Sequence, residues 1–507
     1  CGGPMAHLFL SFNSVEFFYP SSLYPILKNI NFEISRGWTG IAGENGAGKT
    51  TLLLLAAGLL RPTAGTVRRP DDILYCPQRT DEIPGGWEDL FFAADNAAGR
   101  LMDILGIEAD WPYRWDSLSH GERKRFQLAM ALRRNPVMLA VDEPTNHLDG
   151  EAEALVRDAL EEYTGLGLLV SHDRALLDRL CGNCLFLREG AAALRPGGVS
   201  RGLAEEEREL AEQRGLRKKI RDEGERLAAE AGRRRQVAEG SRNRLSKRRI
   251  DPGDRDTRGK INLARLTGKD AVGANQYKRM KNRAGRAEEA LAEVTVRPER
   301  KRGVTLGGRQ ARADRLCFLE AGSIPLGEGR TLSFPDLSIG PEDRIALTGP
   351  NGSGKSTLIR HVLDRIPKGL PRLYLPQELD GEESRAVLDA VLREEEKFRG
   401  EILARFSRLG SDPRLLFRSA LPSPGEIRKL LIARGGFYEP ALIIMDEPTN
   451  HLDLVSVGLL EAALAESAGA RLLVSHDSVF LSRLSNREWS ISRRGGDSRL
   501  EIHYTIR

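Results

Sequence analysis

The sequence predicts an α/β protein in which two tandem domains of the same fold are joined by a long α-helical hairpin. Two observations carry this prediction. A glycine-rich motif and an acidic motif each occur twice in the 507 residues, 306 residues apart at the lysines of the first motif and 304 apart at the aspartates of the second. A strongly basic segment, residues 201–300, separates the copies. An almost constant offset indicates that a whole domain is duplicated.

The glycine-rich motif has the pattern and the surroundings of a phosphate-binding loop. Each copy follows a short apolar run and precedes a helix-like run. In a strand, loop and helix of this kind the backbone N–H groups face an anion, and glycines are needed where a side chain would block phosphates. The lysines would reach the β- and γ-phosphates, and the following hydroxyls would bind Mg²⁺. The residues expected to bind the nucleotide in the first copy are Gly43, Asn45, Gly46, Gly48, Lys49, Thr50 and Thr51. Those expected in the second copy are Gly349, Asn351, Gly352, Gly354, Lys355, Ser356 and Thr357.

An acidic pair follows a predicted buried strand in each copy. The strands are the apolar runs Val137–Val141 and Ala441–Met445, which are typical of central parallel strands. A carboxylate at the carboxyl end of such a strand faces the ligand crevice. Phosphoryl transfer needs a metal ion and a residue that positions the attacking water. The expected Mg²⁺ ligands are Asp142 and Asp446, and the expected catalytic residues are Glu143 and Glu447.

Two further motifs recur in both copies. A Ser-His-Asp sequence follows another strand-like run, and its histidine can donate a hydrogen bond to the γ-phosphate. A Ser-x-x-Glu sequence predicts a capping box at the start of a helix, where a small glycine leaves the N–H groups open to an anion. The expected residues are His172 and His476 for the γ-phosphate, and Ser119, Gly121, Ser423 and Gly425 at the two helix starts.

The ordered motifs resemble ATP-binding cassette domains over residues 8–190 and 320–500, and they include Gln78 and Gln377 after short strands. The resemblance implies that the two cassettes close head to tail on two ATP molecules. The phosphate-binding loop of one cassette then faces the Ser-x-Gly-Glu turn of the other, and both sites hydrolyse ATP. It also implies that the two glutamines lie at the nucleotide and at Mg²⁺.

One position differs between the copies. Tyr19 lies 24 residues before Gly43, where the resemblance implies an aromatic ring stacked on adenine. Pro325 lies 24 residues before Gly349. The nucleotide preference of the second site therefore stays open.

Composition favours a cytoplasmic protein. The most continuous aliphatic run, Leu52–Leu60, has nine residues, about half of what a membrane-spanning helix needs. Five cysteines are too few and too scattered for a disulfide framework. Residues 1–7 are expected to be a remnant followed by a natural start at Met5, because they lack the regions of a signal peptide.

The segment between the copies is predicted to be a helical hairpin that binds RNA. Residues 201–300 hold 28 Lys and Arg against 18 Asp and Glu, whereas the whole chain carries only +5. Met280, Ala284, Ala287, Leu291 and Val294 form a narrow apolar seam, and Leu203, Leu210, Leu216, Ile220 and Leu227 form a looser one that Gly215, Gly224 and Gly232 interrupt. The tip is expected near 248–260. Clustered basic residues suit phosphate backbones, and the expected contacts are Arg242, Arg244, Lys247, Arg248, Arg249, Arg255, Arg258, Lys278 and Arg279.

Twin cassettes with a basic helical linker resemble the F family of ATP-binding cassette proteins. The resemblance implies a monomeric ATPase whose linker contacts ribosomal RNA (23S) and the P-site tRNA near the peptidyl-transferase centre. Only 40 residues separate Gln78 from Leu118, so the arm insertion of several members is missing, which favours the branch that protects ribosomes from antibiotics. The predicted domains are 8–195, 196–311 for the linker and 312–507. A tandem ATP-binding subunit of an importer and a DNA-associated ATPase remain the alternatives.

Overall fold

The computed structural model describes residues 9–20, 24–91, 96–146, 148–244, 260, 263, 269–293, 306–327, 329–414, 416, 422–494 and 497–504. Cys1–Gly202 and Arg300–Arg507 form one compact unit, and Leu203–Glu299 form another. We call the first domain copy, up to residue 196, cassette 1, the second copy, from residue 306, cassette 2, and Leu203–Glu299 the hairpin. The limits predicted for the three domains stay a prediction.

Cassette 1 is built on a six-stranded sheet in the order β5-β6-β7-β3-β8-β9, and a separate antiparallel sheet has the order β2-β1-β4. Neighbouring strands of the larger sheet are parallel except for β8 and β9. The strands are β1 (Leu10–Phe17), β2 (Leu27–Ile34), β3 (Gly37–Gly43), β4 (Ala64–Arg68), β5 (Ile73–Cys76), β6 (Met138–Asp142), β7 (Leu166–Val170), β8 (Cys181–Arg188) and β9 (Ala191–Pro196). The helices are α1 (Lys49–Ala57), α2 (Glu88–Phe91), α3 (Asn96–Leu105), the 3-10 helix η1 (Trp111–Ser117), α4 (His120–Arg134), α5 (Gly150–Glu161) and α6 (Arg174–Leu180).

Cassette 2 repeats the central strand order, because β18-β14-β17-β16-β15 corresponds to β8-β3-β7-β6-β5. The antiparallel strand β19 beside β18 corresponds to β9 beside β8, and the strands beyond it differ: β11 and β12 extend the same sheet, and β10 pairs with β13. The strands are β10 (Cys317–Leu319), β11 (Gly322–Gly327), β12 (Arg330–Phe334), β13 (Leu337–Ile339), β14 (Arg344–Thr348), β15 (Arg372–Leu375), β16 (Leu442–Asp446), β17 (Ala470–Val474), β18 (Arg487–Arg494) and β19 (Asp497–Tyr504). The helices are α10 (Lys355–Arg365), α11 (Gly381–Leu392), α12 (Glu396–Arg408), α13 (Pro424–Phe437), α14 (Leu454–Glu466) and α15 (Ser478–Leu484). The shared order confirms the predicted α/β duplication.

The central strands are buried on both faces, as the apolar runs predicted. Every residue of β6, β7, β16 and β17 is buried. In cassette 2, alternate residues of β14 point into different clusters, since Ile345 and Leu347 pack with Leu358 of α10 while Ala346 packs with Phe406 of α12. Helices therefore cover both faces of the sheet, and the functional motifs are left at the carboxyl edge of its strands.

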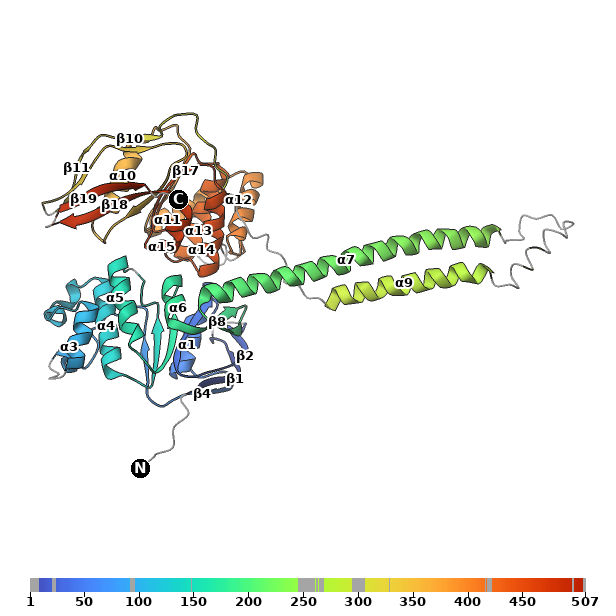
Figure 1. Ribbon diagram of the computed structural model, residues 1–507, viewed down its shortest axis with the longest axis horizontal. Helices are drawn as coiled ribbons and strands as arrows, with labels where there is room; N and C mark the ends of the chain where they lie inside the picture. The colour runs from blue at the N-terminus through green and yellow to red at the C-terminus, as the bar shows by residue number, and fades with distance from the viewer. Residues whose placement is uncertain are drawn as a thin grey trace, which may run out of the picture. The chain divides into compact units, whose positions relative to one another are not determined.

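The hairpin consists of helices α7 (Val199–Arg244) and α9 (Lys269–Glu293), which lie side by side (Figure 1). The predicted seam of α9 is confirmed where it is described, because Met280, Ala284, Ala287 and Leu291 are half-buried, whereas the charged residues between them are exposed. Val294 lies outside the described residues. In the part of the chain that the structure describes, no helix is long and apolar enough to span a membrane.

The seam of α7 differs from the predicted one. Leu227 and Ala231 are buried, whereas Leu216 is 52% exposed and does not belong to the seam. Gly224 is part of the contact and does not interrupt it, because a Cβ built there would lie 3.6 Å from the Cβ of Ala287. Helix α7 continues through its glycines, because the seam positions keep their spacing of four and three residues across them. The small residues let the backbones of α7 and α9 come close.

The predicted RNA contacts fall into three groups. Lys278 and Arg279 are exposed on α9, and Arg242 and Arg244 belong to the end of α7. The others, and most of the predicted tip at 248–260, lie outside the described residues: Lys247, Arg248, Arg249, Arg255 and Arg258.

We predict that Gly224→Leu separates α7 from α9, whereas Gly215→Leu does not. Both changes raise helix propensity equally, but only position 224 faces another helix, and nothing lies within 4 Å of a Cβ at position 215. Overpacking of a contact costs about 1–3 kcal/mol, so amide hydrogen exchange in α9 of the full chain should rise about tenfold in the first variant alone. Equal exchange in the two variants would contradict the packing described for Gly224.

Candidate nucleotide sites

Both phosphate-binding loops start their helix on a glycine with left-handed backbone. Gly48 precedes α1 with φ 96°, and Gly354 precedes α10 with φ 99°. A Cβ at Gly48 would come within 2.7 Å of the Ile26 side chain, so both conformation and space require glycine. Neither helix start has a side-chain cap, which leaves its first N–H groups for an anion. Gly46 and Gly352 also have positive φ, at 79° and 68°.

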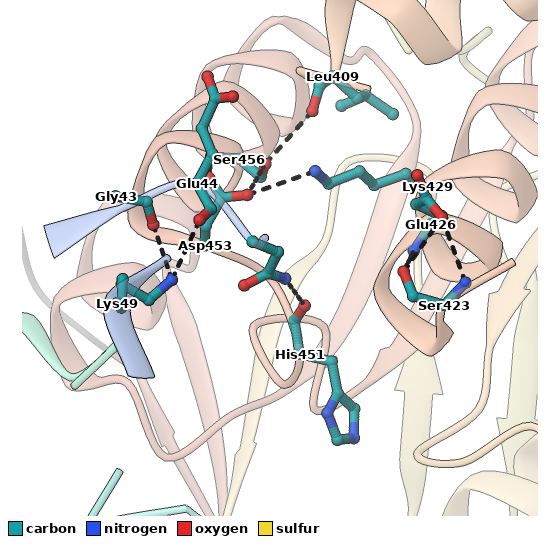
Figure 2. Close-up of polar contacts among 11 residues, drawn as sticks. Gly43, Glu44, Lys49, Leu409, Ser423, Glu426, Lys429, His451, Asp453 and Ser456 are labelled. Atoms are coloured by element: carbon teal, nitrogen blue, oxygen red, sulfur yellow. Dashed lines mark hydrogen bonds and ion pairs between the residues drawn. The ribbon is translucent and has the colours of Figure 1, made fainter. Parts of the chain in front are cut away.

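The lysines of the two motifs fold back over their own loops. Lys49 Nζ donates to the carbonyl oxygens of Gly43 and Glu44 at 2.9 and 3.2 Å, as Figure 2 shows. Lys355 makes the same two contacts with its loop, at 2.6 and 3.1 Å. Burial lowers the pKa of both ammonium groups. The two cations are thus held at the point where the N–H groups of each loop converge.

A hydroxyl and a carboxylate meet beside each lysine. Thr50 Oγ1 donates to Asp142 Oδ2 at 2.9 Å, and Ser356 Oγ donates to Asp446 Oδ2 at 2.7 Å. Burial raises the pKa of both carboxyl groups. Tyr75, which belongs to none of the predicted motifs, also donates to Asp142 at 3.4 Å. Paired hydroxyl and carboxylate oxygens are the hard ligands that Mg²⁺ prefers, so the residues present fit this ion.

The following glutamates have a backbone conformation that is rare outside glycine. Glu143 has φ 46° and Glu447 has φ 49°. The backbone N–H of each donates to the neighbouring strand, to the carbonyl oxygen of Val170 or Val474 at 2.9 Å. A conformation of this kind costs about 1–3 kcal/mol and concentrates at functional sites. The Oε1 atom of each glutamate is buried without a hydrogen-bond partner, which fits a site that takes a water molecule.

The two histidines lie against these glutamates. His172 Nε2 is 3.2 Å from Glu143 Oε1, and His476 Nε2 is 3.4 Å from Glu447 Oε1. Burial lowers the pKa of both imidazoles, that of His476 to about 4. Burial also raises the pKa of Glu447 to about 7. Both rings are therefore neutral at neutral pH, and each keeps one N–H to donate.

The serine turns are capping boxes, as predicted. Ser119 Oγ accepts from the backbone N–H of Glu122 at 3.3 Å, and Glu122 Oε2 accepts from that of Ser119 at 2.7 Å. Ser423 and Glu426 form the same pair at 3.4 and 3.2 Å. Helices α4 and α13 therefore start at fixed points, with the glycines Gly121 and Gly425 in their first turns.

A buried cation on each of these helices bonds to the segment that contains Gln78 or Gln377, which we call the glutamine loop. Neither of these two cations was predicted from the sequence. Lys124 Nζ donates to the carbonyl oxygens of Pro77 and Asp142 at 2.5 and 3.0 Å. Arg428 donates to the carbonyl oxygen of Gln377 at 2.7 Å and to that of the residue after Asp446 at 2.6 Å. Both cations stand five residues after the serine of the capping box, so an alignment of the two copies would have found them.

The turn of cassette 2 lies against the phosphate-binding loop of cassette 1. Asn45 Nδ2 donates to the carbonyl oxygen of His451 at 2.7 Å, and a Cβ at Gly425 would come within 3.4 Å of that nitrogen. We call this site 1. One cavity of about 800 Å³ is lined by its predicted residues Lys49, Thr50, Gln78, Asp142, Glu143, His172, Ser423 and Gly425, and it continues to Lys355, Asp446, Glu447 and His476.

The reverse pairing forms site 2. The backbone N–H of Asn351 donates to Asp149 Oδ2 at 3.3 Å, across the two cassettes. A second cavity, of about 670 Å³, is lined by Ser119, Gly121, Asn351 and Gln377. Each loop therefore faces the turn of the other cassette.

The residue at the position predicted to stack on adenine differs between the two sites. The Tyr19 hydroxyl lies 3.2 Å from Thr51 Oγ1, and its ring packs edge-on against Phe17. In cassette 2, Pro325 is exposed on β11, and its neighbour Leu326 fills the space beside Gly354. An aromatic face is thus present beside the first loop, whereas the matching position beside the second loop is aliphatic. Thr357, also predicted, lies in the first turn of α10.

Known proteins share this organisation. The family model described as ABC transporter matches residues 27–146 and 332–450. The tylosin resistance ATP-binding protein TlrC of Streptomyces fradiae is 29% identical over 91% of this chain and 93% of its own. The ribosome protection protein VmlR of Bacillus subtilis is 28% identical over 94% of this chain and 85% of its own.

Solved structures share the fold. The RNase-L inhibitor matches 96% of this chain and 90% of its own with a TM-score of 0.60 at 19% identity. The matched segments coincide with the two cassettes, and the curated relatives extend across the hairpin as well. The two matched segments are therefore ATP-binding cassette domains, and along most of its length the chain is similar to proteins of the F family, in which one chain carries both cassettes.

Proposed function

We propose that this protein is a cytoplasmic, monomeric ATPase of translation, which hydrolyses ATP at sites 1 and 2 and acts on the ribosome through its hairpin. The observation that carries the proposal is that both nucleotide sites hold a complete residue set in a chain that also contains a basic hairpin. Relatives along almost the whole chain are named for ribosome protection and translational throttling, which supports the ribosome as the partner.

The residues of each site divide the chemistry of hydrolysis among them. Lys49 and the N–H groups at the start of α1 bind the β- and γ-phosphates, and Thr50, Asp142 and Gln78 would hold Mg²⁺. When bound, this ion would supply positive charge that neutralises the phosphates. Glu143 orients the attacking water through Oε1, which accepts no hydrogen bond of good geometry and lies 3.2 Å from His172 Nε2, and His172 donates to the γ-phosphate. The corresponding residues of cassette 2 do the same at site 2.

Closing the cassettes completes both sites. The contacts between Asn45 and His451 and between Asn351 and Asp149 are made to the loops that hold phosphate. ATP between a loop and the opposite turn adds its own contacts to both cassettes, so binding favours the closed state and hydrolysis removes that preference. In this way the nucleotide controls when the hairpin is held on its target.

The hairpin supplies the contact with RNA. Its exposed and clustered arginines and lysines suit the phosphate backbone of 23S rRNA and of P-site tRNA near the peptidyl-transferase centre. A chain that displaces large-subunit antibiotics would use the same hairpin, and the resistance and protection relatives support that branch. Duplex DNA and a membrane partner are the alternatives that the following tests separate.

We predict that Glu143→Gln together with Glu447→Gln traps the protein on ribosomes. The amide keeps the size of the side chain but removes the base, so ATP stays bound and the cassettes stay closed. Co-sedimentation with 70S ribosomes in ATP should rise at least about tenfold over the wild-type chain, while steady-state hydrolysis falls by about 10² or more.

The trapped variant also provides the controls. Adding Lys49→Met and Lys355→Met should abolish its retention, since ATP no longer binds. A trapped variant that binds duplex DNA or membrane fractions, and leaves ribosomes in the supernatant, would overturn the proposed partner.

We predict that Arg244→Ala, Lys247→Ala, Arg248→Ala and Arg249→Ala together weaken ribosome binding and flatten its salt dependence. Each phosphate contact that is lost removes one counterion release, so the slope of log Kd against log salt should fall by roughly 2–4. ATPase activity without ribosomes should persist.

A matched control removes the same charge elsewhere. Arg36, Arg61, Arg68 and Lys368 are exposed on the cassettes, and their replacement by alanine should leave the salt slope unchanged. If the two quadruple variants lost binding equally, net charge and not the hairpin would account for the interaction.

A further inference from the structure

The segment after the acidic motif of cassette 2 is fixed from both cassettes. We call this segment, Leu452–Leu454, loop D2, and the matching segment of cassette 1, Leu148–Gly150, loop D1. The Asp453 carboxylate accepts from Ser456 N–H at 2.9 Å and from Ser456 Oγ at 2.9 Å, and it pairs with buried Lys429 at 3.5 Å (Figure 2). These contacts hold loop D2 within its own cassette.

Arg174 reaches loop D2 from the other cassette. Its Nη2 donates to the carbonyl oxygen of Leu454 at 3.2 Å, and its Nη1 pairs with Glu461 on α14 at 3.0 Å. The side chains of Arg174 and Glu461 are only 10% and 9% exposed, so water screens this pair weakly. Gly458 leaves room for the guanidinium, because a Cβ there would lie 3.5 Å from Nη2.

Arg174 also stands next to the γ-phosphate side of site 1. It is the first residue of α6 and follows His172 and Asp173 directly, and Asp173 caps that helix. Loop D2 in turn borders site 1, because the residue directly before it, His451, accepts a hydrogen bond from Asn45 of the cassette 1 phosphate-binding loop at 2.7 Å. One guanidinium therefore connects the histidine segment of cassette 1 with a loop of cassette 2 that borders the same nucleotide.

Site 2 has no chemical equivalent of this link. The residue two positions after His476, matching Arg174, is Ser478, and the residue that matches Glu461 is Arg157. A serine and an arginine cannot form an ion pair. Loop D1 is also held differently, because Arg125, the counterpart of Lys429, donates to the Leu105 carbonyl oxygen at 2.7 Å instead. Asp149 of loop D1 caps α5 and accepts from Asn351.

We infer that Arg174 is a positioning residue that holds loop D2 at site 1, so that ATP hydrolysis at site 1 depends on this link while hydrolysis at site 2 does not. The inference rests on the proposed ATPase function and adds an inequality between its two sites. Loss of Arg174 leaves Glu461 paired with Arg483 at 2.9 Å, so the variant keeps a partner for the buried carboxylate.

We predict that Arg174→Met lowers hydrolysis at site 1 alone. Glu447→Gln silences site 2 and Glu143→Gln silences site 1, so each background reports one site. In the Glu447→Gln background, Arg174→Met should lower kcat about tenfold with KM for ATP nearly unchanged, the loss expected for a buried charge-assisted hydrogen bond. In the Glu143→Gln background kcat should stay within about twofold. Ser478→Ala is the matched control and should leave both sites within the same limit.

Hydrogen exchange gives a readout independent of turnover. In the full chain with a non-hydrolysable ATP analogue, Arg174→Met should speed exchange over 452–461 about tenfold and leave 148–157 unchanged. Adding Glu461→Gln should change kcat and exchange by no more than about twofold further, because it removes the same link to Arg174 and, besides that, only the pair with the exposed Arg483. Equal losses at both sites, or no change at site 1 or over 452–461, would overturn the inference. Absence of ATP hydrolysis in the wild-type chain would overturn the proposed function instead, and the exchange result would still decide the positioning role.

Discussion

Parallel pairing of three adjacent strands is the constraint on which both nucleotide sites depend. In cassette 1, β7 lies between β6 and β3, so Asp142 pairs with Val170 in register and the phosphate-binding loop leaves the next strand at the same edge. The same order returns in cassette 2. Residues far apart in the chain thus meet because parallel strands end at the same edge of the sheet. This strand order alone brings the hydroxyl of Thr50 to the carboxylate of Asp142.

The strand edge also explains why the glutamates are strained. Glu143 follows the last residue of β6, and its N–H still bonds to Val170, although the chain must leave the sheet there. The left-handed conformation turns the side chain towards His172, whose backbone N–H donates to Glu143 Oε2 at 3.2 Å. Cassette 2 repeats both features. A feature that is unfavourable by itself and occurs twice is part of how the site is built, and it orients the Oε1 atom that lies beside the histidine Nε2 in each cassette.

The sequence predicted what depends on local spacing and left out what depends on packing between distant segments. The capping boxes at Ser119 and Ser423, the buried strands and the apolar seam of α9 follow from spacing alone. The predicted seam of α7 is wrong at Leu216 and Gly224. The prediction takes glycine as an interruption of the seam, although a small residue is what a close helix contact needs. Arg174 looks like ordinary surface charge in the sequence. The two cations of the glutamine loops recur at the same place in both copies, but only the fold shows which carbonyl oxygens they reach.

The two copies agree in the residues proposed to bind phosphate and metal and differ in several residues that face the partner cassette. Lysine, hydroxyl, acidic pair and histidine are matched, with similar distances. The divergent positions, Arg174 against Ser478 and Lys429 against Arg125, hold the loops that pass between cassettes. Duplication made the corresponding positions of the two copies identical at first. If both sites were selected for the same reaction, we would expect these positions to stay alike. Their divergence fits the inequality inferred between sites 1 and 2, because only a fused chain lets each copy change on its own side of the interface.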